Sequence, residues 1–377
     1  MSGLARDTGA INLGQGFPDG PGPVDMLQAA ADATLNGSNQ YPPMRGIPRL
    51  RQAVADHYRR FHGLAITGED VLVTSGATEA LAASLLALIS PGDEVLLIEP
   101  LYDAYLPLVL RAGGTARMVR MEPPAWRLPL DAIAAALRDG VRLLVLNNPV
   151  NPTGRVFDEA ALAALARLCV AHDAIAICDE VWEHVLHGDR RHIPLITLPG
   201  MAEHTVKIGS AGKIFALTGW KVGFVVAAPP LLAGIAGAHQ FLTFTTPPNL
   251  QEAVAYGLAK DDGWFREMRA AYRASHDRLA AGLSRAGYAV LPGEGTYFLC
   301  VDLAASGIAM DDRAFSLAMA HEAGVVSIPL SAFYAEAPLR SAIRLCFAKQ
   351  DAVLDMAIER MAAFRERVLH RAPDVAS

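Results

Sequence analysis

The stretch that decides the fold is residues 174–182, which read AIAICDEVW. Its apolar run ends at Asp179, and similar short runs alternate with Ala- and Leu-rich stretches of helical character from Val71 to Val226. This alternation is typical of βαβ units, so it predicts an α/β fold with a large, doubly wound, mostly parallel sheet. The other expected strands cover residues 71–73, 94–98, 142–146, 205–208 and 222–227.

Polar residues and a glycine follow these runs at the points where the strands should end. They include Gly76, Tyr102, Asn151, Asp179 and Lys213. Ligands of doubly wound sheets bind outside the carboxyl ends of the strands, so we expect these residues to share one site.

The pattern changes after about residue 263. A long charged helix, short strands near 297–301 and 343–347, and a helix from Gln350 onward indicate a smaller α+β domain. The start of the chain, through Pro23, is rich in Gly and Pro and is expected to be loop-like. We predict an N-terminal segment (1–38) that packs with the small domain, a large ligand-binding domain (39–275) and a small C-terminal domain (276–377).

Composition excludes several classes of protein. With 52% hydrophobic and 19% charged residues among 377, the chain should fold into a large core and not be disordered. A net charge of −6 without a basic run argues against nucleic acid as the main partner. No apolar run reaches membrane-spanning length, and residues 1–10 lack the apolar core of a signal peptide. We therefore expect a cytoplasmic protein whose main partner is neither nucleic acid nor a membrane.

Several signatures of other chemistries are missing. Gly212-Lys213 lacks the earlier glycine and the following Ser or Thr of a P-loop, and neither GxGxxG at a helix start, HExxH nor GxSxG occurs. The four cysteines are scattered, and His184, His187 and His192 have no metal-ligand spacing. No metal site is expected.

One ordered set of motifs is specific. It consists of NPTG at 151–154, DE at 179–180, SAGK at 210–213 and TGWK at 218–221. In this order the chain resembles the class I/II aminotransferases of fold type I, which use pyridoxal 5'-phosphate. The resemblance extends from NLGQGFPD at 12–19 to IRLCFA at 343–348, and the opening is similar to that of the kynurenine, glutamine and methionine aminotransferase branch.

The resemblance implies that Lys213 forms the Schiff base with the cofactor. Such a lysine must lose its proton near neutral pH although a free lysine has a pKa near ~10.4, so it should be partly buried near positive groups. Asp179 resembles the carboxylate that keeps the pyridine nitrogen protonated, and Asn151 the amide that donates to the ring oxygen.

The remaining cofactor contacts also follow from the resemblance. Tyr102 would stack on the ring. The phosphate would bind at a helix N-terminus with added hydroxyls and cations, to which the resemblance assigns Gly76, Ala77, Thr78, Ser210, Lys221 and, from a partner subunit, Tyr41. A contribution from Tyr41 in trans would make the active unit a homodimer.

The substrate site is expected to bind an α-carboxylate. A planar guanidinium can hold a carboxylate with two parallel hydrogen bonds, and Arg344 resembles the family's arginine for this task. Gly16 and Phe17 would form a loop over the substrate, with Asn151 beside it. One departure is Trp182, which stands where relatives commonly have Tyr. An indole N–H only donates, so Trp182 either donates to the ring oxygen or fills space.

These features predict an aminotransferase that moves an amino group between an L-amino acid and a 2-oxo acid. The freed Lys213 amine would act as general base and acid at the substrate α-carbon. Aromatic residues around the expected pocket favour an aromatic, kynurenine or methionine-like substrate. Three alternatives remain open at this point: a cysteine-conjugate β-lyase that uses the same cofactor contacts, a succinyl-diaminopimelate aminotransferase, and the aminotransferase-like effector domain of a transcription regulator.

Overall fold

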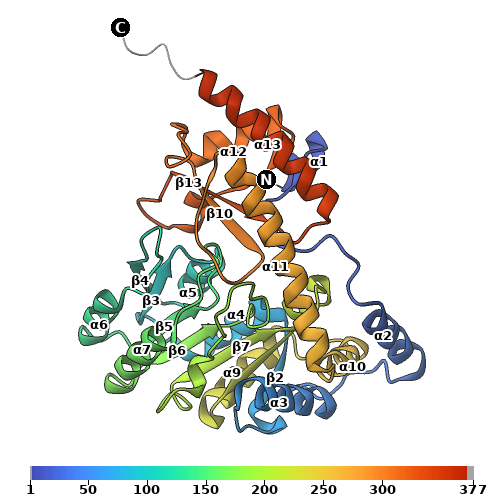
Figure 1. Ribbon diagram of the computed structural model, residues 1–377. Coiled ribbons are helices and arrows are strands. Elements are labelled where there is room, and N and C mark those ends of the chain that lie inside the picture. Colours follow the sequence, from blue (N-terminus) through green and yellow to red (C-terminus); the bar gives the residue numbers. More distant parts are fainter. Residues whose placement is uncertain (1, 372–377) are drawn as a thin grey trace.

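A computed structural model describes residues 2–371 of the chain. Its large sheet has the strand order β2-β8-β7-β6-β5-β3-β4 (Figure 1). The neighbours from β7 to β4 run parallel, whereas β8 is antiparallel to both β2 and β7. The predicted mostly parallel α/β fold is confirmed. The strands are β2 (Val71–Ser75), β3 (Glu94–Glu99), β4 (Thr115–Arg120), β5 (Leu143–Asn147), β6 (Ile175–Asp179), β7 (Thr205–Ser210) and β8 (Val222–Ala227).

Helices cover both faces of this sheet because the strands are apolar on both faces. Successive strand residues point to opposite sides, so Val145 and Ile177 join one core cluster while Leu144 and Cys178 join another. On the first side lie α4 (Gly76–Leu88), α5 (Tyr105–Arg111) and α9 (Pro229–Leu242); on the second lie α6 (Leu130–Arg138) and α7 (Glu159–Ala171). A third cluster lies under α3 (Pro48–His62) and α10 (Pro248–Leu258).

In the large sheet, β4 is the strand that the sequence pattern did not predict. Its residues, TARMVR, contain no continuous apolar run, and all but one of them are partly or fully exposed. β4 lies at the edge of the sheet, where one neighbour is missing and solvent reaches the strand. Pairing with the buried β3 therefore determines its conformation.

The C-terminal part of the chain forms a second, smaller layer above the sheet in Figure 1. Its strands pair in the order β12-β13-β10-β9, and the long helix α11 extends from the large sheet to this layer. The elements are α11 (Asp262–Arg285), β9 (Ala289–Val290), β10 (Phe298–Asp302), α12 (Asp312–Glu322), β11 (Val325–Val326), β12 (Ile328–Pro329), β13 (Ala342–Cys346) and α13 (Asp351–Arg371). These elements match the expected α+β composition.

The N-terminal segment contacts both parts. α1 (Ser2–Thr8) packs against α12, and β1 (Ile11–Asn12) pairs in parallel with β11, whereas α2 (Val24–Asn36) packs against α10. The expectation of a purely loop-like start is wrong for residues 2–8. Ala5 is buried against Val326 and Ala320, so tertiary packing stabilises a short helix that the Gly-rich sequence does not predict. The division at residues 38 and 275 stays a prediction.

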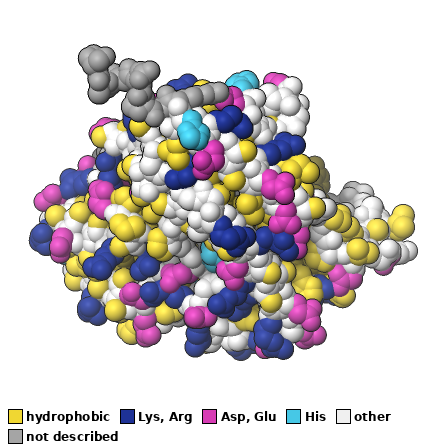
Figure 2. Space-filling view, turned by 45° about the horizontal axis from the view of Figure 1, so that its top comes forward, with side chains coloured by type: hydrophobic (Ala, Val, Ile, Leu, Met, Phe, Trp, Pro, Cys, Tyr) yellow, Lys and Arg dark blue, Asp and Glu magenta, His cyan; other side chains and the backbone are white. Residues whose placement is uncertain are grey.

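The surface mixes charges of both signs. Figure 2 shows Lys and Arg interspersed with Asp and Glu over the face it draws. Hydrophobic and uncharged side chains dominate the projecting edge at the right, where α2 lies in Figure 1. Within residues 2–371, no helix is both long and apolar enough to cross a membrane.

Candidate active site

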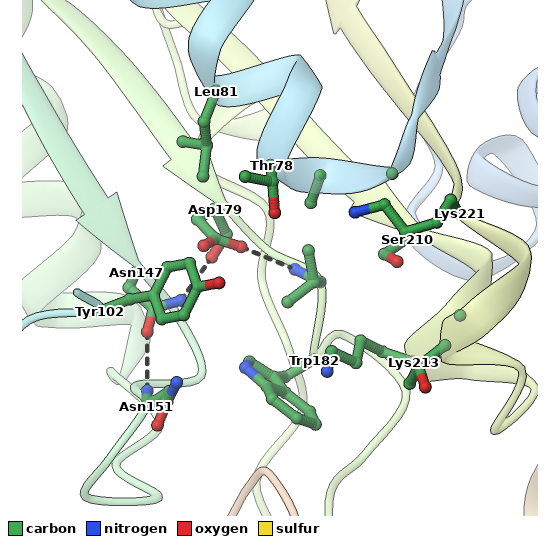
Figure 3. A pocket seen from close by; sticks show the side chains of 15 residues that line it. Thr78, Leu81, Tyr102, Asn147, Asn151, Asp179, Trp182, Ser210, Lys213 and Lys221 are labelled. Atoms are coloured by element: carbon green, nitrogen blue, oxygen red, sulfur yellow. Dashed lines mark hydrogen bonds between the residues drawn. The ribbon is translucent and has the colours of Figure 1, made fainter. Parts of the chain in front are cut away.

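A cavity opens at the carboxyl ends of the central strands, where the strand-end rule places a ligand. Figure 3 shows side chains from several separate elements facing into it. The cavity has a volume of about 220 Å³ and is lined by Gly76, Ala77, Thr78, Leu81, Tyr102, Asn147, Asn151, Asp179, Val181, Trp182, Ser210, Gly212, Lys213, Thr218 and Lys221. Nine of the predicted cofactor residues thus meet in one place, together with Trp182.

Lys213 lies in the short helix α8 (Ala211–Ile214), which follows β7 directly. Burial lowers its pKa to about 8, although Asp179 acts in the opposite direction. The amine nitrogen lies 4.8 Å from the centre of the Trp182 ring and 3.2 Å from the Tyr297 hydroxyl oxygen. A lysine with this pKa is neutral near pH 7 far more often than an ordinary lysine, which favours a nucleophilic amine.

Asp179 ends β6 and is buried beneath the cavity. Burial raises its pKa, whereas a hydrogen bond of 2.6 Å from the Tyr105 hydroxyl favours the ionised form. Asn147, at the end of β5, donates to the Asp179 backbone carbonyl at 2.8 Å and accepts from the Asn151 backbone N–H at 2.7 Å. Asp179 is therefore held through its carboxylate by Tyr105 of α5 and through its backbone by Asn147 of β5.

One end of the cavity has the features of a phosphate cradle. Gly76 begins α4 with φ +70°, and a Cβ there would lie 3.0 Å from the Lys221 amine nitrogen. A side chain at this position would fill the space in front of the helix N-terminus. The α4 N–H groups, the hydroxyls of Thr78 and Ser210, and the Lys221 ammonium together offer donors suited to a phosphate (Figure 3).

Arg344 lies on β13 and comes to the site from the smaller layer. Its guanidinium donates to the Asn151 side-chain oxygen at 2.8 Å and to the Gly14 carbonyl at 2.9 Å, and it stacks 3.8 Å from the Phe298 ring centre. Its Nε is buried without a hydrogen-bond partner within the described residues. Burial lowers the pKa of Arg344 to about 10, so the side chain stays cationic at neutral pH.

Three further predicted residues lie outside the cavity lining. The Gly16 carbonyl lies 3.4 Å from the Lys213 nitrogen, and Phe17 lies beside Lys349 with its ring partly exposed. Tyr41 lies in a second hollow formed by α2, α10 and the loop after α2. Its ring is 84% exposed, so in a single chain it contacts no part of the candidate site.

Tyr105 and Tyr297 are absent from the sequence-based prediction. The hydroxyl of Tyr105 reaches Asp179 from α5, and that of Tyr297 reaches Lys213 from the segment before β10. Tyr105 begins α5, three residues after Tyr102, which is a weak sequence signal. Nothing in the local sequence around Tyr297 indicates a contact with a lysine 84 residues away.

Behind the cavity lies a buried ionic cluster on the far side of β6. The Lys207 ammonium, on β7, lies 2.9 Å from the Glu180 carboxylate and 2.8 Å from that of Glu183. Glu183 also contacts His62, and Glu180 contacts His192. Of the other two histidines in the 184–192 stretch, His184 lies near this cluster, with its ring centre 6.3 Å from that of His62, and pairs with His57. His187 stacks on His276.

Comparison with known proteins identifies the family of this chain. A family model described as aminotransferase class I and II matches residues 8–361. The chain is 45% identical to a probable N-succinyldiaminopimelate aminotransferase of Mycobacterium tuberculosis, covering 97% of this chain and 95% of that one. It is 40% identical to the methionine aminotransferase of Escherichia coli, covering 96% and 94%.

Solved structures agree with the sequence comparisons. That of N-succinyldiaminopimelate aminotransferase from Mycobacterium tuberculosis superposes with a TM-score of 0.93 at 46% identity, over 96% of this chain and 95% of that one. An aspartate aminotransferase of Thermus thermophilus with maleate gives 0.89 at 32% identity, over 96% and 94%. The chain is an aminotransferase, and it belongs to the class I and II family, which uses pyridoxal 5'-phosphate.

Proposed function

We propose that the enzyme transaminates an L-amino acid whose α-carboxylate binds Arg344 and whose α-carbon lies beside Lys213. The observation on which the proposal rests is the convergence of Lys213, Asp179 and Arg344 on one cavity that also contains an anion cradle. Lys213 would hold the cofactor covalently, and Thr78, Ser210 and Lys221 would bind its phosphate. Bound pyridoxal phosphate supplies an electron-withdrawing ring that stabilises negative charge on the substrate α-carbon.

Each side chain of the site has its own role in the proposed reaction. Burial lowers the pKa of Lys213 to about 8, so the neutral amine is accessible near neutral pH and can accept the α-proton and return it to a neighbouring carbon as general base and acid. Asp179, ionised with help from Tyr105, would keep a positive charge on the ring nitrogen. Arg344 orients the substrate through its carboxylate, and Trp182 shields the lysine from water on one side.

The favoured substrates carry an aromatic or thioether side chain. Tyr102 and Trp182 line the cavity, and Phe298 and Phe333 lie against Arg344. The methionine aminotransferase relative supports this class. A second candidate is N-succinyl-diaminopimelate, which the 45% identity with a probable N-succinyldiaminopimelate aminotransferase favours.

A substrate panel tests the proposal. The purified enzyme is assayed with methionine, phenylalanine, kynurenine and N-succinyl-diaminopimelate, each with 2-oxoglutarate as the amino acceptor. We expect the highest kcat/KM with one of the first three, and a clear preference for the succinylated compound would move the assignment to the second candidate. Cysteine conjugates without an acceptor provide the control, because pyruvate and ammonia would indicate β-lyase activity.

Borohydride reduction tests the assignment of the lysine. The chain has five lysines, at positions 207, 213, 221, 260 and 349, so peptide mapping identifies the labelled position directly. We expect the reduced cofactor on Lys213, and Lys213→Ala should lose the label together with turnover. Label on any other lysine would contradict the assignment.

We also propose that the active unit is a homodimer. Leu35, Tyr41, Phe241 and Phe244 are exposed, and the rings of Tyr41 and Phe244 pack edge to face at 5.6 Å. An apolar surface of this kind on a charged molecule favours a protein partner. A second copy would cover it and could bring Tyr41 to the phosphate cradle of its neighbour. The four free, buried thiols support a reducing, cytoplasmic compartment.

A further inference from the structure

Tyr297 presents its hydroxyl to the reactive lysine from a part of the chain that the motifs do not include. The hydroxyl oxygen lies 3.2 Å from the Lys213 nitrogen, and its proton is donated to the Gly16 carbonyl. Because that proton is committed to Gly16, the oxygen directs a lone pair to the lysine. The Lys213 nitrogen also lies 3.4 Å from the Gly16 carbonyl, so the three groups form a closed triangle of polar contacts.

The ring of Tyr297 is held firmly from several sides. It is fully buried, packs edge to face on Trp182 with ring centres 4.4 Å apart, and lies against Tyr272 and Phe298. A ring enclosed in this way has little freedom to move its hydroxyl away from the lysine. The position of the oxygen is therefore set by packing before any ligand binds.

The backbone before Tyr297 supports the same conclusion. Thr296 has φ +64°, a left-handed conformation that is unfavourable for a β-branched residue. Its N–H donates to the Val185 carbonyl at 2.8 Å, and its hydroxyl accepts from the Phe298 N–H at 3.1 Å. Strained backbone that neighbouring contacts hold in place is typical of functional sites. Here it turns Tyr297 toward the lysine.

The triangle also links Lys213 to the substrate-binding loop. Gly16 is two residues from Gly14, whose carbonyl accepts a hydrogen bond from Arg344. We propose that Tyr297 is a positioning residue for Lys213, which fixes the lysine nitrogen and ties it to the loop that buttresses Arg344. The inference rests on the proposed function, because it assumes that Lys213 is the reacting amine.

Other charged or titratable groups also shift the pKa of Lys213. Asp179 from β6 and Cys346 from β13 favour the protonated amine, whereas Arg344 from β13 and Lys221 oppose it. Tyr297 itself faces Cys346, Tyr272 and Arg344. A variant that changes only the Tyr297 hydroxyl leaves all of these groups in place, so its effect on the lysine can be read separately.

The experiment is a spectrophotometric pH titration of the holoenzyme, in which the absorption of the bound cofactor reports the protonation of the Lys213 nitrogen. Tyr297→Phe removes the lone pair that stabilises the protonated nitrogen, so the midpoint should fall by about 0.5 to 1 unit. The variant should also raise KM for the amino acid, because the Gly16 loop loses a hydrogen bond. Tyr272→Phe is the matched control, since this partly buried tyrosine packs on Tyr297 and, within residues 2–371, makes no hydrogen bond to the lysine; its midpoint should equal that of the wild type.

The outcomes separate the two proposals. A wild-type enzyme that shows no absorption band of bound cofactor would overturn the proposed function itself. If Tyr297→Phe titrates with the same midpoint as the wild type, only the proposed role of Tyr297 is overturned. Tyr297→His keeps a ring and an acceptor, so its titration midpoint should lie between those of the wild type and Tyr297→Phe. If Tyr297→Phe does not fold, the midpoint of Tyr297→His is compared with that of the wild type instead.

Discussion

At the scale of single residues, Arg344 illustrates how a buried cation is prepared for a ligand. Its guanidinium is stacked on Phe298 and held by Asn151 and Gly14, yet Nε has no partner within the described part of the chain. Arg344→Lys keeps the charge but loses the planar fork. We expect KM for the amino acid to rise about 10- to 100-fold with a smaller change in kcat, measured by steady-state kinetics. An unchanged KM would show that the carboxylate binds elsewhere.

Tyr105 is a second residue with a predictable role, because its hydroxyl lowers the pKa of Asp179. Burial raises the pKa of Asp179, and the Tyr105 hydrogen bond counteracts it. Tyr105→Phe should therefore raise that pKa further, so the charge is lost at higher pH. We expect the acid limb of the kcat profile to move to higher pH and kcat at neutral pH to fall about 10-fold. Tyr288→Phe is the control, because its hydroxyl bonds to the Met361 carbonyl in the smaller layer.

At the scale of elements, β6 and β7 are joined by the buried cluster around Lys207. Lys207→Met leaves Glu180 and Glu183 as buried, uncompensated carboxylates, so it should lower the free energy of unfolding by about 3–5 kcal/mol in urea titrations. Arg117→Met is the matched control: Arg117 also lies between two carboxylates, Glu94 and Asp139, but at the surface, and the loss should be small.

The same cluster predicts how stability depends on pH. Burial opposes ionisation of Glu183, but Lys207 and His62 outweigh it and hold the pKa of Glu183 well below its ordinary 4.5. A carboxylate with a depressed folded-state pKa stabilises the protein above its unfolded pKa and loses this contribution as pH falls. We expect the urea midpoint of the wild type to fall as pH drops below about 4.5. Lys207→Met should show a weaker dependence in the same range.

The sequence predicts some helices, strands and site residues and misses others, and the difference has a physical cause. Continuous apolar runs give the strands of the sheet interior, because burial on both faces requires such runs, whereas the edge strand β4 is half-exposed and leaves no such pattern. Lys213 and Asp179 are found from motifs at strand ends. Tyr105 and Tyr297 are not, because their hydroxyls reach the site only through the packing of α5 and of the segment before β10.

At the scale of the whole molecule, the proposed dimer can be tested by complementation. Lys213→Ala and Tyr41→Ala are each expected to be strongly impaired as homodimers. In a mixed dimer, the subunit that keeps Lys213 would receive an intact Tyr41 from its partner. Refolding or coexpressing equal amounts should then restore about a quarter of wild-type activity, since half of the dimers are mixed and each contains one complete site. No recovery would show that Tyr41 does not act across the interface.

The strand order also affects how the protein is made. β2 ends at Ser75, directly before the glycine of the phosphate cradle, and in the large sheet it pairs only with β8, whose pairing begins at Val222. A ribosome adds the intervening 222 − 75 = 147 residues in about 7 to 30 s. During that interval the nascent chain has an unpaired apolar strand, and the turn at Gly76 lacks Lys221, against which it packs. If the cofactor binds at this turn, as proposed, it can bind during translation only after β8 has emerged from the ribosome.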